Sequence, residues 1–388
     1  MSNRDRGLSS SAEYTVIPGF CDVHVHFREP GFSYKETIST GSAAAARGGY
    51  TTVCTMPNLD PVPDSLGNLK MQLDIIDRDS LINIYPFASI TVGEKGEALT
   101  PMEEICLKYG DRIAGFSDDG KGVASDAVMR EAMIRAAELG KIISAHCEDV
   151  GLTRGGYIND GRYAAAHGII GIPSESEWRQ IARDLELAAQ TGCRYHVCHI
   201  SCRESVALIR EAKASGIDVS CETAPHYLLF DEDCLCDDGR FRMNPPLRSP
   251  DDREALVEGI KDGTIDMIAT DHAPHSAEEK SGGLKNSAFG IVGIETAFPA
   301  LYTKLVLEGV ITFEKLTDLL CRNPRKRFGF PQDDGWSAWD LEREFTVDSA
   351  DFLSKGRSTP FEGMKLRGVC MQTVCGGETV YRLKDDTL

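Results

Sequence analysis

RIAGFSDDGKGVASDAVMREAMIRAAELGKIISAHCE, residues 112–148, contains a strand, a helix and a second strand in one run. RIAGFSD and KIISAHCE are short and apolar, as buried strands are. Between them, DAVMREAMIRAAELG repeats apolar residues at the helical period and ends in glycine, a usual helix stop. Two consecutive strands that are joined by a helix lie parallel in one sheet, so this stretch predicts a βαβ unit.

The same alternation extends outward from this unit in both directions. Segments of helical period, such as RQIARDLELAAQTG and REALVEGIKDG, separate strand-like segments rich in Val, Ile, Tyr and Thr. Eight parallel strands with helices between them can close into a (β/α)₈ TIM barrel of the α/β class, which buries both faces of each strand. A doubly wound open sheet is the alternative. The strand segments are TVIPGFCDVHVHF (15–27), YTTVCTMP (50–57), INIYPFASI (82–90), RIAGFSD (112–118), KIISAHCE (141–148), RYHVCHIS (194–201), DVSCETAPHYL (218–228) and IDMIATDHAPH (265–275).

The chain is expected to have three parts: a polar N-terminal segment (1–14), the barrel (15–330) and a β-rich tail (331–388). The tail contains short β-like pieces with glycine-rich turns, such as GVCMQT and ETVYRL, which predict a small, separate β element. Long loops follow the second, fifth and eighth strands. They lie at the carboxyl ends of the strands, where this type of barrel carries its active site.

Composition excludes several classes of partner. The net charge of −18, from 60 acidic and 42 basic residues, disfavours nucleic acid and anionic membranes. The first residues are polar and lack a signal-peptide core, and no run approaches the roughly 18 apolar residues of a membrane span, so a cytoplasmic protein is expected.

The 13 cysteines are scattered and odd in number, which indicates reduced thiols. Cys234 and Cys236 lack a second pair and are a weak zinc signal.

Six residues of ligand type fall at the ends of five predicted strands. His24 and His26 are two apart in DVHVHF, so both side chains should lie on one face of the strand, with Val23, Val25 and Phe27 on the other. The remaining four end the fourth, fifth, sixth and eighth strands and point to the same barrel mouth: Asp119, His146, His199 and Asp271. Each alone has an ordinary structural explanation, but chance rarely delivers the whole set to one face.

Four imidazoles and two carboxylates suit Zn²⁺. Six protein ligands exceed the needs of one tetrahedral site, so two ions per chain are expected, with Asp119 able to bridge them. A hydroxide held between two such ions is a nucleophile, which predicts a hydrolase. His167 and His196 are expected to be structural or surface residues, whereas His226 and His272 are either orienters of the ligands or simply packed.

The motifs PGFCDVHVHFREPG, TMPN, FSDDG, HCED, HIS, NPPLR and TDHAPH, in this order, resemble class I dihydroorotases of the amidohydrolase superfamily. The resemblance spans residues 17 to 330 and continues weakly into the tail. It implies that His24, His26, Asp119, His146, His199 and Asp271 are the metal ligands and that Asp271 is also the acid/base. It further implies that Arg28, Asn58 and His275 hold the substrate carboxylate, with Asn244 near the ring. The ordinary alternative for Arg28 is a salt bridge to Glu29 or another neighbour.

The activity implied by the resemblance is the reversible cyclisation of N-carbamoyl-L-aspartate to L-dihydroorotate plus water, in pyrimidine biosynthesis. A small-molecule substrate, a homodimer and an association with aspartate transcarbamoylase are the implied partners. Related hydantoinases and allantoinases usually bridge their metals with a carboxylated lysine, and here Asp119 stands at the corresponding strand end. Family members also carry some fifty residues before the first barrel strand, but only about fifteen precede it here, so an incomplete β element is expected.

Two other functions are compatible with these motifs. An allantoinase-like or hydantoinase-like cyclic amidohydrolase would use similar metals without a carboxylate cradle. A catalytically silent subunit that scaffolds a transcarbamoylase is the second alternative, although silent relatives should lack ligands and none is missing from this sequence.

Overall fold

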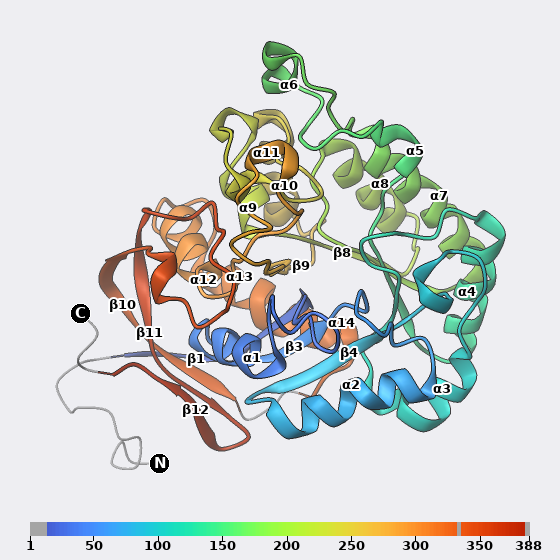
Figure 1. Cartoon of the computed structure of the whole chain (residues 1–388), viewed down its shortest axis with the longest axis horizontal. Coiled ribbons are helices and arrows are strands. Elements are labelled where there is room, and N and C mark those ends of the chain that lie inside the picture. Colours follow the sequence, from blue (N-terminus) through green and yellow to red (C-terminus); the bar gives the residue numbers. More distant parts are fainter. Residues whose placement is uncertain (1–13, 332–334, 385–388) are drawn as a thin grey trace.

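The computed structural model describes residues 14–331 and 335–384, so the predicted polar segment 1–14 lies outside it except for Tyr14. Its centre is a sheet of eight parallel strands in sequence order, wrapped by helices (Figure 1). The (β/α)₈ prediction is therefore confirmed. The strands are β2 (Phe20–Val25), β3 (Tyr50–Thr55), β4 (Asn83–Ser89), β5 (Gly115–Ser117), β6 (Ile142–Ala145), β7 (Arg194–Val197), β8 (Val219–Thr223) and β9 (Met267–Ile268).

The barrel closes where the end of its last strand meets its first. His272, just beyond β9, pairs with Val25 in a parallel bridge, and the His26 backbone N–H donates to the His272 carbonyl over 2.8 Å. Within the sheet, Thr270 donates its N–H and hydroxyl to the buried Asp22 carboxylate on β2. These contacts join residues almost 250 positions apart at the rim that carries the predicted site.

Helix α4 (Asp126–Glu138) shows why the covering helices form. Ser125 is its N-cap and accepts from the Val128 N–H, which satisfies a donor that the first turn leaves unpaired. The buried side chains of Met129, Ala132, Met133 and Ala136 recur at three- and four-residue spacing and form one apolar stripe toward the sheet. Burying each methionine contributes about 1.5–3 kcal/mol, so packing on the barrel outweighs the helical propensity of the exposed face.

The other helices between strands are α1 (Ile38–Arg47), α2 (Leu66–Asp79), α3 (Met102–Tyr109), α7 (Glu175–Thr191), α8 (Arg203–Ala214) and α10 (Pro250–Asp262). Short helices lie in the loops: α5 (Val150–Thr153), α6 (Arg162–His167), α9 (Pro225–Leu229), α11 (Gly283–Asn286) and the 3-10 turns η2 (Val92–Glu94), η3 (Gly110–Arg112), η4 (Glu232–Cys234) and η5 (Gly239–Phe241). After β9 come α12 (Ala297–Leu301), π-helical η6 (Tyr302–Val306), α13 (Phe313–Thr317), π-helical η7 (Asp318–Arg322) and α14 (Asn323–Phe328).

A second, antiparallel sheet stands beside the barrel in the order β1-β10-β11-β12 (Figure 1). Its strands are β1 (Thr15–Pro18), β10 (Trp336–Thr346), β11 (Lys365–Cys375) and β12 (Glu378–Arg382), and η8 (Ser349–Asp351) lies between β10 and β11. The small β element expected from the tail is confirmed, and it gains β1 from the other end of the described chain.

The predicted first strand, residues 15–27, is therefore divided between the two sheets, and the expectation of one continuous strand was wrong. The division falls at Gly19, where a Cβ would lie 2.1 Å from the Thr51 hydroxyl oxygen, so only glycine lets the chain pass this close to β3. Phe20 then packs its ring against Trp339 of β10, with 6.0 Å between ring centroids. This aromatic contact holds the small sheet on the barrel.

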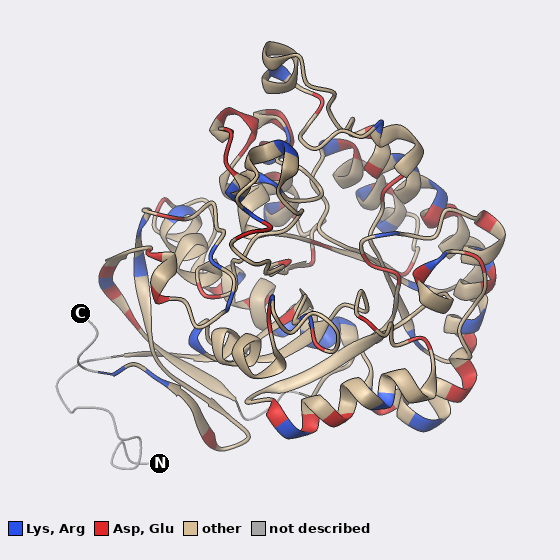
Figure 2. Ribbon diagram, in the orientation of Figure 1, with Lys and Arg blue, Asp and Glu red and all other residues tan. Residues whose placement is uncertain are grey.

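Charged residues lie mainly on the outer helices and loops, whereas the barrel strands carry few of them (Figure 2). No pair of cysteines forms a disulfide in the described chain. In the described residues, no helix combines the length and the apolar character that a membrane crossing requires.

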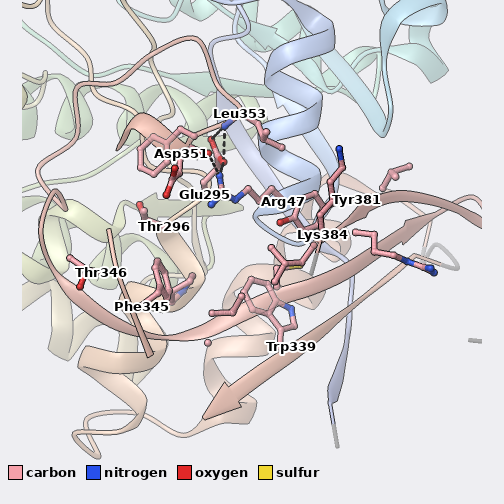
Figure 3. A pocket seen from close by; sticks show the side chains of 18 residues that line it. Arg47, Glu295, Thr296, Trp339, Phe345, Thr346, Asp351, Leu353, Tyr381 and Lys384 are labelled. Carbon is pink, nitrogen blue, oxygen red and sulfur yellow. Dashed lines mark hydrogen bonds and ion pairs between the residues drawn. The ribbon is translucent and has the colours of Figure 1, made fainter. Parts of the chain in front are cut away.

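A cavity of about 510 Å³ lies between the small sheet and the barrel helices α1 and α12 (Figure 3). Arg47 and Glu295 form an ion pair of 3.1 Å at its wall, and Trp339, Phe345 and Tyr381 supply aromatic surface. None of the residues predicted to form the functional site lines this cavity.

Candidate metal centre and substrate cradle

Strand β2 presents two histidines to the barrel mouth through an irregular backbone. Its pairing with β3 shifts register between Asp22 and Val25. Val23 consequently packs in the same apolar cluster as barrel residues such as Met267, whereas Val25 and Phe27 pack in the outer core. The regular alternation predicted for DVHVHF was therefore wrong at Val23, although both imidazoles do reach the same cluster.

All six predicted ligands converge at the carboxyl ends of the strands. Asp119 is central: its carboxylate oxygens lie 3.3 Å from His24 Nε2, 3.5 Å from His26 Nε2 and 3.6 Å from His199 Nε2. Asp271 Oδ1 lies 3.1 Å from His26 Nε2, and His146 Nδ1 lies 4.0 Å from Asp119 Oδ1. The cluster thus has two wings, one with His24 and His26 and the other with His146 and His199, and the Asp119 carboxylate is common to both.

The donor atoms of this cluster fit a divalent cation. Four of its buried atoms have no hydrogen-bond partner among the described residues: His24 Nε2, Asp119 Oδ1, His146 Nε2 and His199 Nδ1. Leaving buried polar atoms unpaired costs about 1–3 kcal/mol each, so such a concentration in one place needs compensation. The six predicted ligands supply two compact groups of potential ligand atoms, one of His24, His26 and Asp119 and the other of Asp119, His146 and His199. A third group in the described chain joins His24 to Cys198 and Glu222.

The electrostatics keep both carboxylates ionised. Burial alone would raise the pKa of Asp119, but the imidazoles of His24 and His199 hold it well below its usual range. Asp271 behaves in the same way, since His26 and His24 outweigh burial and lower its pKa. Burial and the Arg28 guanidinium lower the pKa of His26. Burial acts in the same direction on His24 and His146, but Asp119 raises the pKa of His24 well above its usual range and Glu148 raises that of His146, so these rings hold protons that a bound cation would displace.

Three of the predicted site residues have left-handed backbone conformations. The φ angles are 55° at Arg28, 32° at His199 and 48° at Asp271, and none of these is a glycine. Each such conformation costs of order 1 kcal/mol or more and persists only where the surroundings enforce it, commonly at functional sites. The strain is therefore concentrated on the residues that aim side chains into the mouth.

Arg28 is a buried cation that has no carboxylate partner among the described residues. Its side chain donates Nε–H to the Pro274 carbonyl over 3.3 Å, and only 8% of the residue is exposed. In the described parts of the chain it forms no ion pair, and Glu29 instead accepts from the Ile38 N–H. Burial lowers the pKa of Arg28 to about 10, so it stays charged at neutral pH. The salt-bridge alternative for Arg28 therefore has no support.

His275 lies beside Arg28, 3.4 Å from its Nη2. Its Nε2 donates to the Phe289 carbonyl over 2.7 Å, and its Nδ1 faces Lys35 Nζ at 3.3 Å. Burial, Arg28 and Lys35 lower the pKa of His275 to about 3, so the ring is neutral. Lys35 also pairs with Glu279 at 2.8 Å, which ties the loop after β2 to the loop after β9.

The other two predicted substrate residues already have protein partners. Asn58 is half-buried, and its amide oxygen lies 2.9 Å from His26 Nδ1, so Asn58 orients a ligand in addition to facing the mouth. Asn244 donates its amide to Glu148 over 3.1 Å, while its Oδ1 is buried without a described partner. Asn244 thus reaches the site through Glu148, whose carboxylate lies 3.9 Å from His146 Nε2.

The remaining histidines divide as follows. His167 is exposed on α6, and His196 is fully buried under the site. Burial lowers the pKa of His226 to about 4, and its Nε2 has no partner among described residues. His272 accepts from the Gly293 N–H and lies 3.5 Å from Glu36.

The sequence interpretation missed two residues that touch this site, Glu222 and Lys35. Glu222 is a fully buried acid that lies 2.7 Å from His24 Nδ1. Its signal in the sequence was an acidic residue inside the otherwise apolar and small segment DVSCETAPHYL. Lys35 gave no such signal, because a lysine in a polar loop is usually a surface residue.

Comparison with known proteins places these motifs in one family. The family model described as dihydro-orotase-like matches residues 14–205. A dihydroorotase from Fusobacterium nucleatum is 51% identical over 379 residues, which cover 96% of this chain and 88% of that protein. A dihydroorotase from Bacillus subtilis is 49% identical over 374 residues, covering 94% of this chain and 87% of that protein.

Solved structures of cyclic amidohydrolases share the fold. An L-hydantoinase from Arthrobacter aurescens aligns with a TM-score of 0.84 and 27% identity, covering 95% of this chain and 86% of that one. A dihydropyrimidinase from Brevibacillus agri aligns with a TM-score of 0.82 at 24% identity, covering 96% of this chain and 87% of that one, which is evidence for the fold alone.

Proposed function

This chain belongs to the dihydroorotase family, and from that premise we propose that it catalyses the reversible closure of N-carbamoyl-L-aspartate to L-dihydroorotate plus water, a step of pyrimidine biosynthesis. The observation that carries the proposal is Arg28, a buried guanidinium without an ion-pair partner in the described chain, two residues beyond His26. A guanidinium pairs bidentately with a carboxylate, and L-dihydroorotate presents a carboxylate beside its reactive ring.

In the proposed metal centre two zinc ions would be held by six residues, of which Asp119 belongs to both groups of ligands: His24, His26, Asp119, His146, His199 and Asp271. The convergence of these donors and their unpaired buried atoms support it. When bound, zinc ions lower the pKa of water and polarise a carbonyl oxygen, the two requirements of amide hydrolysis at neutral pH. A shared aspartate in place of a carboxylated lysine makes the centre independent of carbon dioxide.

The protein residues position the substrate and move its proton. Arg28 binds the carboxylate, and the Asn58 amide N–H completes the cradle while its oxygen orients His26. Neutral His275, beside Arg28, has a single N–H on Nε2, which turns from the Phe289 carbonyl to the carboxylate when substrate binds. Asp271, ionised and 3.1 Å from His26 Nε2, accepts a proton from the attacking water on its carboxylate and delivers it to the leaving ring nitrogen. In ring closure the same carboxylate takes the proton from the nitrogen.

The test is a comparison of substrates on purified protein with its zinc content measured. L-Dihydroorotate should be hydrolysed with a much higher specificity constant than dihydrouracil or hydantoin, which offer Arg28 no carboxylate. A protein that prefers the uncharged rings is a hydantoinase-like enzyme, and one that holds zinc but hydrolyses none of them is a silent subunit. Either result contradicts the proposal.

Assembly as a homodimer, and association with an aspartate transcarbamoylase, remain predictions from the resemblance. Light scattering of the purified chain, alone and mixed with a transcarbamoylase, tests both. A monomer that shows no change in mass on mixing contradicts them without affecting the proposed activity.

A further inference from the structure

Glu222 of β8 lies beneath the proposed metal centre and is 1% exposed. Its Oε1 lies 2.7 Å from His24 Nδ1 and accepts from the backbone N–H of His199 over 3.3 Å. Its Oε2 lies 3.0 Å from His196 Nε2. One buried carboxylate thus contacts two predicted metal ligands and a third imidazole, and it lies on a strand that contributes no ligand itself.

These contacts determine which nitrogen of His24 carries the hydrogen. An ionised carboxylate only accepts hydrogen bonds, so the Nδ1 beside Glu222 carries a hydrogen, and Nε2 is the only nitrogen of the ring that can offer a lone pair to a metal ion. His24 Nε2 faces Asp119 Oδ1 at 3.3 Å and has no hydrogen-bond partner among the described residues. This arrangement is favourable only with a proton or a metal ion between the two atoms, and a bound metal ion would take the place of the proton.

The second ligand is held through its backbone. The N–H that Glu222 accepts belongs to His199, whose φ of 32° is unusual for a residue with a side chain. The hydrogen bond anchors this peptide where the strand ends. The carboxylate therefore influences one ligand from each wing of the cluster.

A polar chain continues behind Glu222. His196 Nε2 donates to Oε2, which leaves His196 Nδ1 to accept from the Ser220 hydroxyl over 2.7 Å. Ser220, His196, Glu222 and His24 form a relay of hydrogen bonds in which every donor is matched to an acceptor. Fully satisfied buried networks of this kind hold one arrangement of their members.

We propose that Glu222 is a positioning residue for the metal centre: it selects the His24 tautomer whose Nε2 binds the ion and fixes the backbone of His199. This inference rests on the proposed function, since it presupposes a metal held by His24 and His199. In this proposal the hydrogen bonds of Ser220 and His196 hold the Glu222 side chain in place.

The experiment compares zinc affinity in the full-length parent and two single variants. Glu222→Gln keeps the size of the side chain but removes its charge and one acceptor oxygen. Glu177→Gln is the matched control, because Glu177 is also buried and accepts from the Ser201 N–H and the Ser205 hydroxyl without touching a predicted ligand. Zinc dissociation constants are measured by competition with a chromophoric chelator, and the visible spectrum of the cobalt-loaded proteins reports ligand geometry.

Glu222→Gln should weaken zinc binding by about tenfold to a hundredfold, the usual effect of removing a partner of a ligating histidine, and should alter the cobalt spectrum. Glu177→Gln should match the parent in both. Equal affinity in the parent and Glu222→Gln, or an equal loss in Glu177→Gln, overturns the role of Glu222. A parent that binds no zinc overturns the proposed metal centre as well, so the two failures are distinguishable.

If Glu222→Gln does not yield folded protein, Ser220→Ala decides the question. It removes the hydroxyl that faces His196 and leaves the carboxylate in place. A smaller loss of zinc affinity, about twofold to fivefold, supports the relay. Unchanged affinity overturns it.

Discussion

Asp271 has two proposed roles, because it is both a metal ligand and the group that carries the proton. Asp271→Asn keeps one oxygen and a residue type that tolerates the φ of 48°, so the backbone should survive. Turnover should fall about 10²–10⁴-fold, the usual contribution of an acid/base group, while part of the zinc stays bound. Steady-state kinetics with metal analysis checks this. Near-normal turnover would transfer the proton role to His275.

Arg28 determines which ring is chosen. Charge-assisted hydrogen bonds contribute roughly 1.5–3 kcal/mol each, so Arg28→Ala should lower kcat/KM for L-dihydroorotate by about tenfold to a hundredfold or more. Zinc content and the weak hydrolysis of dihydrouracil should not change. Lys121→Ala is the control, since it removes a cation after β5 that pairs with Glu94 at 3.6 Å and does not touch Arg28. Equal losses on both substrates would mean that Arg28 supports the fold or the metals.

Single residues also show how far the sequence could be interpreted. The six proposed ligands were predictable because each ends a strand, and strand ends meet at one rim. Glu222 was not, since a carboxylate inside a strand acquires its partners from β2 and β7, which only the closed barrel brings near. The second contact of Asn58, to His26, was hidden for the same reason.

At the scale of elements, the loop after β9 is held by a buried lysine. Lys280 donates to the carbonyls of Arg242, Ala288 and Gly290 over 3.1, 2.7 and 2.6 Å. This loop also supplies the Phe289 carbonyl to His275. The lysine therefore connects the fold of the loop to the orientation of a proposed substrate residue.

Lys280→Met should loosen this loop, because methionine has a similar length but no donor. The carbonyls of Ala288 and Gly290 lose their partner, whereas that of Arg242 still accepts from the Gly290 N–H. Each unsatisfied buried group costs about 1–3 kcal/mol, so the free energy of unfolding should fall by roughly 2 kcal/mol or more. Amides near residues 280–292 should exchange faster, and the KM for L-dihydroorotate should rise. Lys285 is an exposed lysine in the same loop, and Lys285→Met should leave the free energy of unfolding, the amide exchange and the KM unchanged. Equal exchange in both variants would contradict the anchoring role.

The eight barrel strands were predictable in number and order, but the bounds of the first were not. Residues 15–25 are compatible with one strand interrupted at Pro18-Gly19, but their pattern does not show that the first part pairs with β10 and the second with β3. The deciding feature is the close approach of Gly19 to Thr51, a contact between residues 32 positions apart. Strand boundaries set by such contacts are not encoded in local periodicity.

At the scale of the whole molecule, metal removal should affect both stability and activity. Ligands that bind only the folded chain stabilise it, by about 4 kcal/mol when zinc stands at a thousand times its Kd. Chelation should therefore lower the Tm of the protein and abolish hydrolysis. Zinc alone should restore both, because the Asp119 carboxylate requires no carbon dioxide. Recovery that depends on added bicarbonate would contradict the assignment of Asp119.

The closure of the barrel between β2 and the end of β9 also sets an order of events during synthesis. His24 and His26 are translated early, but Asp271 and the Thr270 groups that hold Asp22 are among the last parts of the barrel to be made. When translation has only reached residue 270, the nascent chain has part of the proposed set of metal ligands, and one edge of β2 has no neighbouring strand. Under the proposed ligand set, a complete metal centre would therefore form only after almost the whole barrel has been translated.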